Sequence, residues 1–227
     1  MAIVAFISQK GGVGKSTLAR GLAREAAHSG LTVKLADLDT QQSTSTDWHR
    51  LRLAQNGKPA IPVQAYPSVA VALRDARNFD YFVIDAPARA SKGTLEIAGA
   101  ADLVVQPTGA SLDDLRPAIR VFHEFKASGI RVKRMHFALC RIGTPAEEAD
   151  ARAFLEDAGY LVLPGCLLER PAYRAAQGIG KSVTETKFAT LNKRAGALIS
   201  AIARSLEDAE TEEATKKPVR RSAAARR

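Results

Sequence analysis

The stretch Gln9–Ser16 reads QKGGVGKS and directly follows an apolar run, IVAFI, at Ile3–Ile7. A strand, a glycine-rich turn and a helix in that order form the context that a phosphate-binding loop requires. The glycines let another group approach the backbone, so their N–H groups and the start of the helix can surround an anion. An ordinary glycine-rich turn with two solvated lysines is the simpler alternative, but it leaves the coincidence of these features unexplained. The stretch therefore predicts a phosphate site, with Lys15 reaching the β- and γ-phosphates and Ser16 ligating Mg²⁺.

The loop departs from the plain Walker A pattern, which has a glycine where this chain has Gln9. An extra lysine, Lys10, stands near its beginning instead. This resembles the deviant Walker A motif of the ParA/MinD superfamily of ATPases. The resemblance implies that ATP and Mg²⁺ bind here, and that Lys10 crosses to the nucleotide of a second subunit in a sandwich homodimer, where it stabilises charge as an arginine finger does. The residues that it implies for nucleotide binding are Gly11, Gly12, Val13, Gly14, Lys15, Ser16, Thr17 and Pro107.

Two carboxylates, Asp37 and Asp39, follow a predicted strand at Thr32–Ala36. The carboxyl ends of strands are where open α/β sheets bind ligands. An Asp-rich turn that caps the next helix is the alternative for this pair. The segment resembles the Asp-x-Asp-Pro-Gln motif of the superfamily, with Thr40 in place of the proline. The resemblance implies that Asp39 positions or activates the attacking water, while Asp37 supports the Mg²⁺ shell.

A third acid, Asp85, ends the apolar run YFVID, which is typical of a buried parallel strand. The run resembles a Walker B strand, which implies that Asp85 holds Mg²⁺ through water. Where the superfamily continues Thr-Pro-Pro, this chain has Ala86-Pro87-Ala88, a change that could alter how hydrolysis is signalled to a partner. The resemblance thus implies a metal set of Ser16, Asp37 and Asp85, and a catalytic set of Lys10, Lys15 and Asp39.

Strands and helices alternate over nearly all of the 227 residues. This predicts an α/β fold with a mostly parallel twisted sheet and helices on both faces. We expect one P-loop ATPase domain over residues 1–206, ending in an amphipathic helix at Ala189–Ala209. A charged tail over 207–227 should be disordered, because its composition cannot bury a core. For Trp48, packing is favoured over a stacking platform for a base.

Several features indicate a cytoplasmic protein. The chain enters a strand at once, which argues against a signal peptide. No apolar run approaches the roughly 20 residues of a membrane span. Cys140 and Cys166 stand in separate segments without metal-binding spacing, so we expect two buried structural thiols in a reducing compartment.

The formal net charge is +9, of which the tail, with six basic and five acidic residues, contributes one unit. Residues 1–206 therefore carry +8, which points to a polyanionic partner such as nucleic acid. The segment Glu169–Glu185 resembles a late basic stretch of the superfamily, and residues 170–194 contain six basic residues against one acid, Glu185. A solvated surface is the alternative for such a run. With the overall charge, we expect non-specific DNA binding by Arg170, Arg174, Lys181, Lys187, Lys193 and Arg194.

The resemblance covers about residues 2–206 and implies a small ParA-type partition or positioning ATPase without an N-terminal helix-turn-helix domain. ATP would close the dimer on nucleoid DNA, and a ParB-like or other small adaptor would stimulate the hydrolysis that releases it. The cargo could be a plasmid, a chromosome, a protein cluster or a conjugation complex. One alternative is a MinD-like membrane-associated regulator, although the last twelve residues contain only Val219 as a large apolar anchor. Another is a metabolic enzyme of the same fold, such as an ATP-dependent amidoligase or a dethiobiotin-synthetase-like protein.

Overall fold

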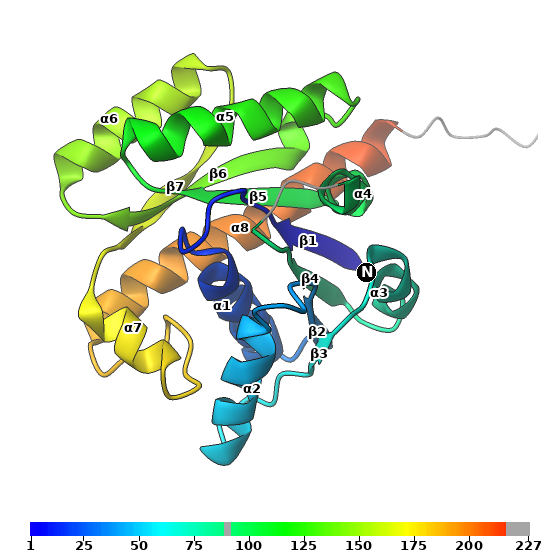
Figure 1. The fold of residues 1–227 in the computed structure, drawn as a ribbon, viewed down its shortest axis with the longest axis vertical. Coiled ribbons are helices and arrows are strands. Elements are labelled where there is room, and N and C mark those ends of the chain that lie inside the picture. The colour runs from blue at the N-terminus through cyan, green and yellow to red at the C-terminus, as the bar shows by residue number, and fades with distance from the viewer. Residues whose placement is uncertain (89–91, 217–227) are drawn as a thin grey trace, which may run out of the picture.

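The computed structural model describes residues 1–88 and 92–216, and its strands form one sheet in the order β3-β2-β4-β1-β5-β6-β7 (Figure 1). Every neighbouring pair in this sheet is parallel, which confirms the predicted α/β fold class. The strands are β1 (Ala2–Phe6), β2 (Val33–Asp37), β3 (Val63–Ala65), β4 (Tyr81–Asp85), β5 (Leu103–Thr108), β6 (Met135–Ile142) and β7 (Leu161–Leu168).

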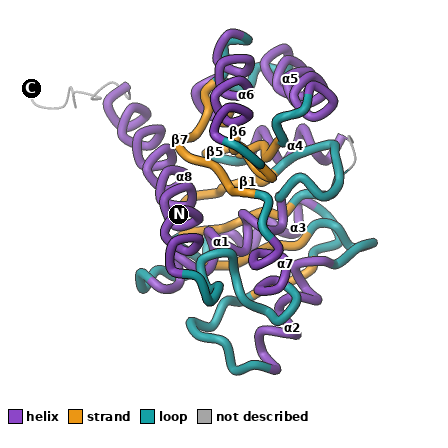
Figure 2. The backbone as a smooth tube through the Cα atoms, turned by 90° about the vertical axis from the view of Figure 1, so that its left-hand side faces the viewer, coloured by secondary structure: helices purple, strands orange, loops and turns teal. Residues whose placement is uncertain are grey.

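Helices cover both faces of the sheet, as its apolar strands require. On one face of the sheet, α1, α2, α7 and α8 form a core with one alternating set of β1 side chains. On the other face, α3, α4, α5 and α6 form a second core with the other set (Figures 1 and 2). The helices are α1 (Lys15–His28), α2 (Thr44–Ala54), α3 (Val69–Ala76), α4 (Lys92–Ala100), α5 (Leu112–Ala127), α6 (Pro145–Asp157), α7 (Pro171–Gln177) and α8 (Ala189–Lys216), with a 3₁₀ turn at Val132–Arg134.

The central position of β1 places the glycine-rich loop in the middle of the carboxyl edge of the sheet. β1 pairs with β4 on one side and with β5 on the other. In the next pair along, Asp37 at the end of β2 lies opposite Asp85 at the end of β4. Because all these strands run in the same direction, the loop and both acids meet at one edge, where α/β sheets bind ligands.

The structure corrects the prediction for the C-terminal region. Helix α8 continues to Lys216, beyond the predicted helix end at Ala209, so residues 210–216 are helical where a disordered tail was expected. The segment is rich in Glu and contains neither glycine nor proline, so nothing in it ends the helix that precedes it. Figure 2 shows this end of α8 projecting from the sheet. The rest of the expected tail, residues 217–227, lies outside the described residues.

Candidate functional site

The glycine-rich loop between β1 and α1 has the backbone conformation that its sequence predicts. Gly12 has φ 73° and Gly14 has φ 115°, in a region that side chains rarely adopt. A Cβ at Gly14 would also lie 3.2 Å from the sulfur of Cys140 on β6. Gly14 is the N-cap of α1, and it supplies no side-chain hydrogen bond to the first turn. The uncapped N–H groups of α1 are therefore available to an anion.

Lys15 is buried directly at this helix start, with 7% of its surface exposed. Its ammonium donates to the carbonyl oxygen of Lys10 at 3.3 Å. Burial lowers the pKa of Lys15, against the attraction of Asp85 and Asp39. A cation that is buried without a contacting carboxylate favours the approach of an anion, because an anionic ligand offsets the loss of solvation.

Asp85 is buried beside this lysine and is only partly hydrogen-bonded. Ser45 donates to its Oδ2 at 2.7 Å, whereas its Oδ1 has no partner among the described residues. Burial raises the pKa of Asp85, against the hydroxyl groups of Ser45 and Ser16, which both lower it. The hydroxyl of Ser16 lies 3.1 Å from that of Thr44. An unpartnered carboxylate oxygen near hydroxyl groups is the type of donor set that Mg²⁺ and its water ligands prefer, so these residues fit the predicted ion.

Asp37 has a different environment from Asp39, although the two are neighbours in sequence. Asp37 is fully buried, and its Oδ2 accepts from the Ser45 N–H at 3.1 Å and from the N–H and hydroxyl of Thr46 at 3.0 and 3.1 Å. Its Oδ1 accepts from the Asp39 N–H at 3.1 Å. Asp37 thus caps the N-terminus of α2, as the alternative interpretation of the pair has it, and its support of a metal shell stays a prediction.

Asp39 is half-buried and accepts from the Gln42 N–H at 3.1 Å. It lines a cleft of about 270 Å³ together with the glycine loop, Lys15, Ser16 and Asp85. The structure therefore brings eight of the predicted nucleotide, metal and catalytic residues to one space: Gly11, Gly12, Gly14, Lys15, Ser16, Thr17, Asp39 and Asp85. Pro107 lines no part of this cleft. Its Cβ lies 3.8 Å from the position that a Cβ on Gly14 would take, so it supports the loop from behind.

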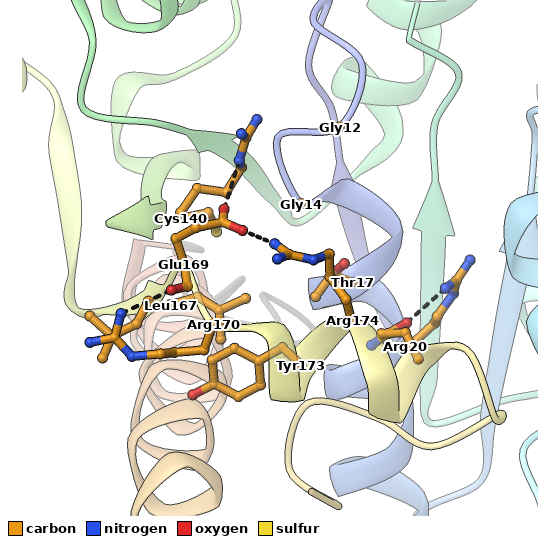
Figure 3. Close-up of a pocket in the computed structure, with 13 residues that line it drawn as sticks. Gly12, Gly14, Thr17, Arg20, Cys140, Leu167, Glu169, Arg170, Tyr173 and Arg174 are labelled. Atoms are coloured by element: carbon orange, nitrogen blue, oxygen red, sulfur yellow. Dashed lines mark hydrogen bonds and ion pairs between the residues drawn. The ribbon is translucent and has the colours of Figure 1, made fainter. Parts of the chain in front are cut away.

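A second cavity of about 400 Å³ adjoins the other side of the loop, and Figure 3 shows the side chains around it. It is bounded by the carboxyl ends of β6 and β7 and by α7. Sequence reasoning missed Cys140, Arg141 and Tyr173 here; the carboxyl-end position of the first two was the signal that could have identified them. The lining residues are Gly12, Gly14, Thr17, Arg20, Cys140, Arg141, Leu167, Leu168, Glu169, Arg170, Tyr173, Arg174 and Gln177.

Lys10 points away from both spaces and pairs with Asp114, in the first turn of α5. Its side chain is 48% exposed. The Ser111 hydroxyl donates to the other oxygen of Asp114 at 2.9 Å. In a single chain, then, the lysine that the resemblance directs to a second subunit is held by a carboxylate of its own chain.

The six predicted DNA-binding residues are all exposed, and they lie on three successive segments of the chain. Arg170 and Arg174 border the second cavity, where Arg174 pairs with Glu169. Lys193 and Arg194 lie in the first turns of α8, and Lys181 and Lys187 lie on the connection between α7 and α8. DNA contact by these residues stays a prediction.

The predicted burial of Trp48 and of the two cysteines is confirmed. Trp48 packs in the core with 2% exposure, and its indole N–H donates to the Lys181 carbonyl oxygen at 3.0 Å. Cys140 and Cys166 are buried free thiols. No helix in the described part of the chain combines the length and apolar character needed to cross a membrane.

A family model, the CobQ/CobB/MinD/ParA nucleotide binding domain, matches residues 4–219. The chain belongs to this family. The match confirms the resemblance that the glycine loop carries, and members of the ParA/MinD family are ATPases. A comparison with curated proteins finds no match.

Solved structures of family members share the fold. The septum site-determining protein MinD with Mg-ADP from Pyrococcus horikoshii is 18% identical, with a TM-score of 0.69 over 96% of this chain and 99% of that one. An ATP complex of McdA from Cyanothece is 20% identical, with a TM-score of 0.69 over 89% and 96%. A plasmid partition protein from Borrelia burgdorferi bound to AMPPNP is 17% identical, with a TM-score of 0.67 over 89% and 98%. At these identities the likeness shows the fold.

Proposed function

We propose that this protein is an ATP-dependent partition or cargo-positioning ATPase. ATP pairs two subunits, the pair binds DNA without sequence preference, and hydrolysis separates it. The observation that carries the proposal is the convergence of Lys15, Ser16, Asp39 and Asp85 on one cleft, beside a loop with a second lysine, Lys10. The solved relatives that hold ATP, AMPPNP or Mg-ADP support a nucleotide in this place.

The triphosphate would lie against the uncapped start of α1 and Lys15, and the base and ribose would enter the 400 Å³ cavity. The two spaces adjoin through Gly12, Gly14 and Thr17, which line both. Ser16 and Asp85 would hold Mg²⁺, which when bound neutralises charge on the β- and γ-phosphates. Asp39 would orient the attacking water, since its carboxylate borders the same cleft.

Lys10 would provide the contact between subunits. To reach a partner it must leave Asp114, and an ion pair with one half-exposed member contributes only about 0–1 kcal/mol. The phosphates of a second subunit offer more negative charge in a less solvated place. Release of Lys10 from Asp114 is thus compatible with an assembly that depends on ATP.

DNA binding by the paired form is supported by the charge of +8 on residues 1–206 and by the exposure of the six basic residues. An adaptor protein would stimulate hydrolysis, and the cycle would take place on the nucleoid in the cytoplasm.

The test is nucleotide binding by Lys15→Ala, with Lys126→Ala on the exposed end of α5 as the matched control. Lys15→Ala should lose ATP binding, and the control should keep it.

Wild-type protein should then bind random-sequence duplex in ATP but not in ADP, with an affinity that falls steeply as salt rises. Retained ATP affinity in Lys15→Ala would remove the loop from the site. ATP-dependent binding to anionic vesicles instead of DNA would favour the membrane-associated alternative, and turnover coupled to a small acid would favour the metabolic one.

Asp39→Ala tests the catalytic assignment separately. The phosphate cradle stays intact while the water loses its orienting group, so the variant should bind ATP, pair and hydrolyse poorly. Size-exclusion chromatography in ATP should show a persistent dimer. A wild-type turnover rate would exclude Asp39 from the reaction.

A further inference from the structure

Arg20 is a buried arginine between the two cavities, and the site described above does not use it. It lies on α1 one turn after Ser16, so both side chains are on the same helix face. Only 7% of Arg20 is exposed, and its guanidinium lies 5.5 Å from the centre of the Trp48 ring. It lines both the cleft beside Asp85 and the cavity beside α7.

The hydrogen bonds of Arg20 run in two directions. Its Nε donates to the Ser45 hydroxyl on α2 at 3.2 Å. Its Nη1 donates to the side-chain carbonyl oxygen of Gln177 on α7 at 2.7 Å, a bond that Figure 3 marks with a dashed line at Arg20. Both partners are uncharged. Burial lowers the pKa of the guanidinium, against the attraction of Asp85 and Asp37. A planar guanidinium can donate along two fixed directions at once, so Arg20 joins α2 to α7.

The first direction leads to Asp85, the acid that would hold Mg²⁺ in the cleft. A serine hydroxyl has one proton, and Ser45 donates it to Asp85 Oδ2 at 2.7 Å, so it accepts from Arg20. The result is an ordered chain from Arg20 through Ser45 to Asp85. It holds one carboxylate oxygen and leaves Oδ1 without a partner among the described residues. Bonds of this kind orient a residue that holds a metal ion.

The second direction leads to the basic surface. Gln177 is the last residue of α7, the helix that carries Arg174 and has Arg170 as its N-cap. The Nε2 of Gln177 has no partner among the described residues, so its bond from Arg20 is the side-chain connection of this helix end to α1. A shift of Arg20 would therefore break this hydrogen bond between α1 and the C-terminal end of α7.

We propose that Arg20 is a positioning residue that links Asp85 to α7, so that a Mg²⁺-nucleotide in the cleft orders the surface that presents Arg170 and Arg174. The inference rests on the proposed function and identifies the route between its nucleotide site and its basic surface. Because coupling is reciprocal, a polyanion on α7 would in turn tighten Mg²⁺-nucleotide binding.

Two variants of the full chain test the two directions separately. Ser45→Ala interrupts the bonds toward Asp85, and Gln177→Leu interrupts the bond toward α7. Arg20→Met interrupts both while keeping a long side chain against Trp48. Arg152→Met is the matched control, because Arg152 is also partly buried and also joins a helix to a strand, through the Leu163 carbonyl oxygen at 3.0 Å.

The first measurement is the Mg²⁺ concentration at which a fluorescent ATP analogue is half bound. Ser45→Ala and Arg20→Met should raise this midpoint about tenfold, whereas Gln177→Leu and the control should not. The second is hydrogen exchange of peptides from residues 171–177, with and without Mg-ATP. Mg-ATP should slow exchange in the wild type and in the control, but not in Arg20→Met or Gln177→Leu.

The outcomes separate the inference from the function on which it rests. Wild-type protein that binds no ATP analogue would overturn both. Wild-type protein that binds it, with Arg20→Met showing the wild-type midpoint or the wild-type protection of α7, would overturn the role of Arg20 alone. If Arg20→Met does not fold, the single-direction variants decide: unchanged behaviour of both Ser45→Ala and Gln177→Leu overturns the link.

Discussion

Asp37→Ala should destabilise the nucleotide-free protein far more than Asp39→Ala, because the carboxylate of Asp37 accepts more hydrogen bonds than that of Asp39. Asp37 accepts three hydrogen bonds from Ser45 and Thr46 at the start of α2, and one from the backbone of Asp39. A single N-cap is worth about 0.5–2 kcal/mol, and each net hydrogen bond about 0.5–1.5 kcal/mol. Removing the carboxylate also leaves a buried N–H group of Ser45 unpaired. The loss should therefore be about 3 kcal/mol, or about 6–12 °C in melting temperature for a chain of this size.

Urea unfolding in EDTA measures this effect in the absence of any metal. Asp39 makes one bond in a partly exposed turn, so Asp39→Ala should lie within about 0.5 kcal/mol of wild type. The opposite result would be equal stability of Asp37→Ala and wild type in EDTA, with the variant less stable than wild type only when both are in Mg-ATP. The carboxylate would then serve the metal and not the helix. That result would refute the capping argument.

Two further predictions concern charge. Burial raises the folded-state pKa of Asp85, so its ionised form destabilises the nucleotide-free protein at neutral pH, and this cost disappears as pH falls through the raised pKa. Asp85→Asn should therefore melt at a higher temperature than wild type at pH 8 in EDTA, with a difference that shrinks toward acid pH; an equal or lower melting temperature at pH 8 would contradict this. Replacing Arg170, Arg174 and Lys181 together with alanine should abolish ATP-dependent DNA binding, whereas deleting residues 217–227, which carry five of the basic residues, should only make the salt dependence shallower. ATP affinity measured on the same proteins is the control, because two of these arginines border the 400 Å³ cavity; loss of DNA binding on the deletion alone would place the contact in the tail.

The parts of the fold that could be predicted are those in which one local pattern has one physical outcome. One apolar run ends in Asp85, and another ends before the glycines that precede Lys15. Each predicts a buried strand with functional residues at its carboxyl end, and the structure contains both strands. The parallel direction of the strands also follows from the alternation of strands and helices, whereas their order in the sheet was not predicted. Helix α4 was not predicted, because its sequence KGTLEIAGA contains two glycines and its burial against the sheet outweighs their low helix propensity.

The rest of the site depends on contacts between distant segments, which no local pattern reveals. The bond from Arg20 to Gln177 joins residues 157 positions apart, and the cavity at Cys140 exists only because β6 lies beside the glycine loop. Strand β7 continues through Pro164 to Leu168, because an edge strand tolerates a proline. Asp37 shows the same limit: its spacing from Asp39 suits a metal or a cap, and only the position of α2 decides which bonds it makes.

The most direct test of the central claim is the molar mass of the protein in solution by light scattering, with ATP and Mg²⁺, in an Asp39→Ala background that slows hydrolysis. The account predicts the mass of two chains with Lys10 present, and the mass of one chain with Lys10→Ala, although that variant still binds ATP. With ADP, both should have the mass of one chain. If Lys10→Ala pairs as readily as its parent, or if the parent has the mass of one chain at saturating ATP, Lys10 does not join two subunits and the proposed cycle is wrong.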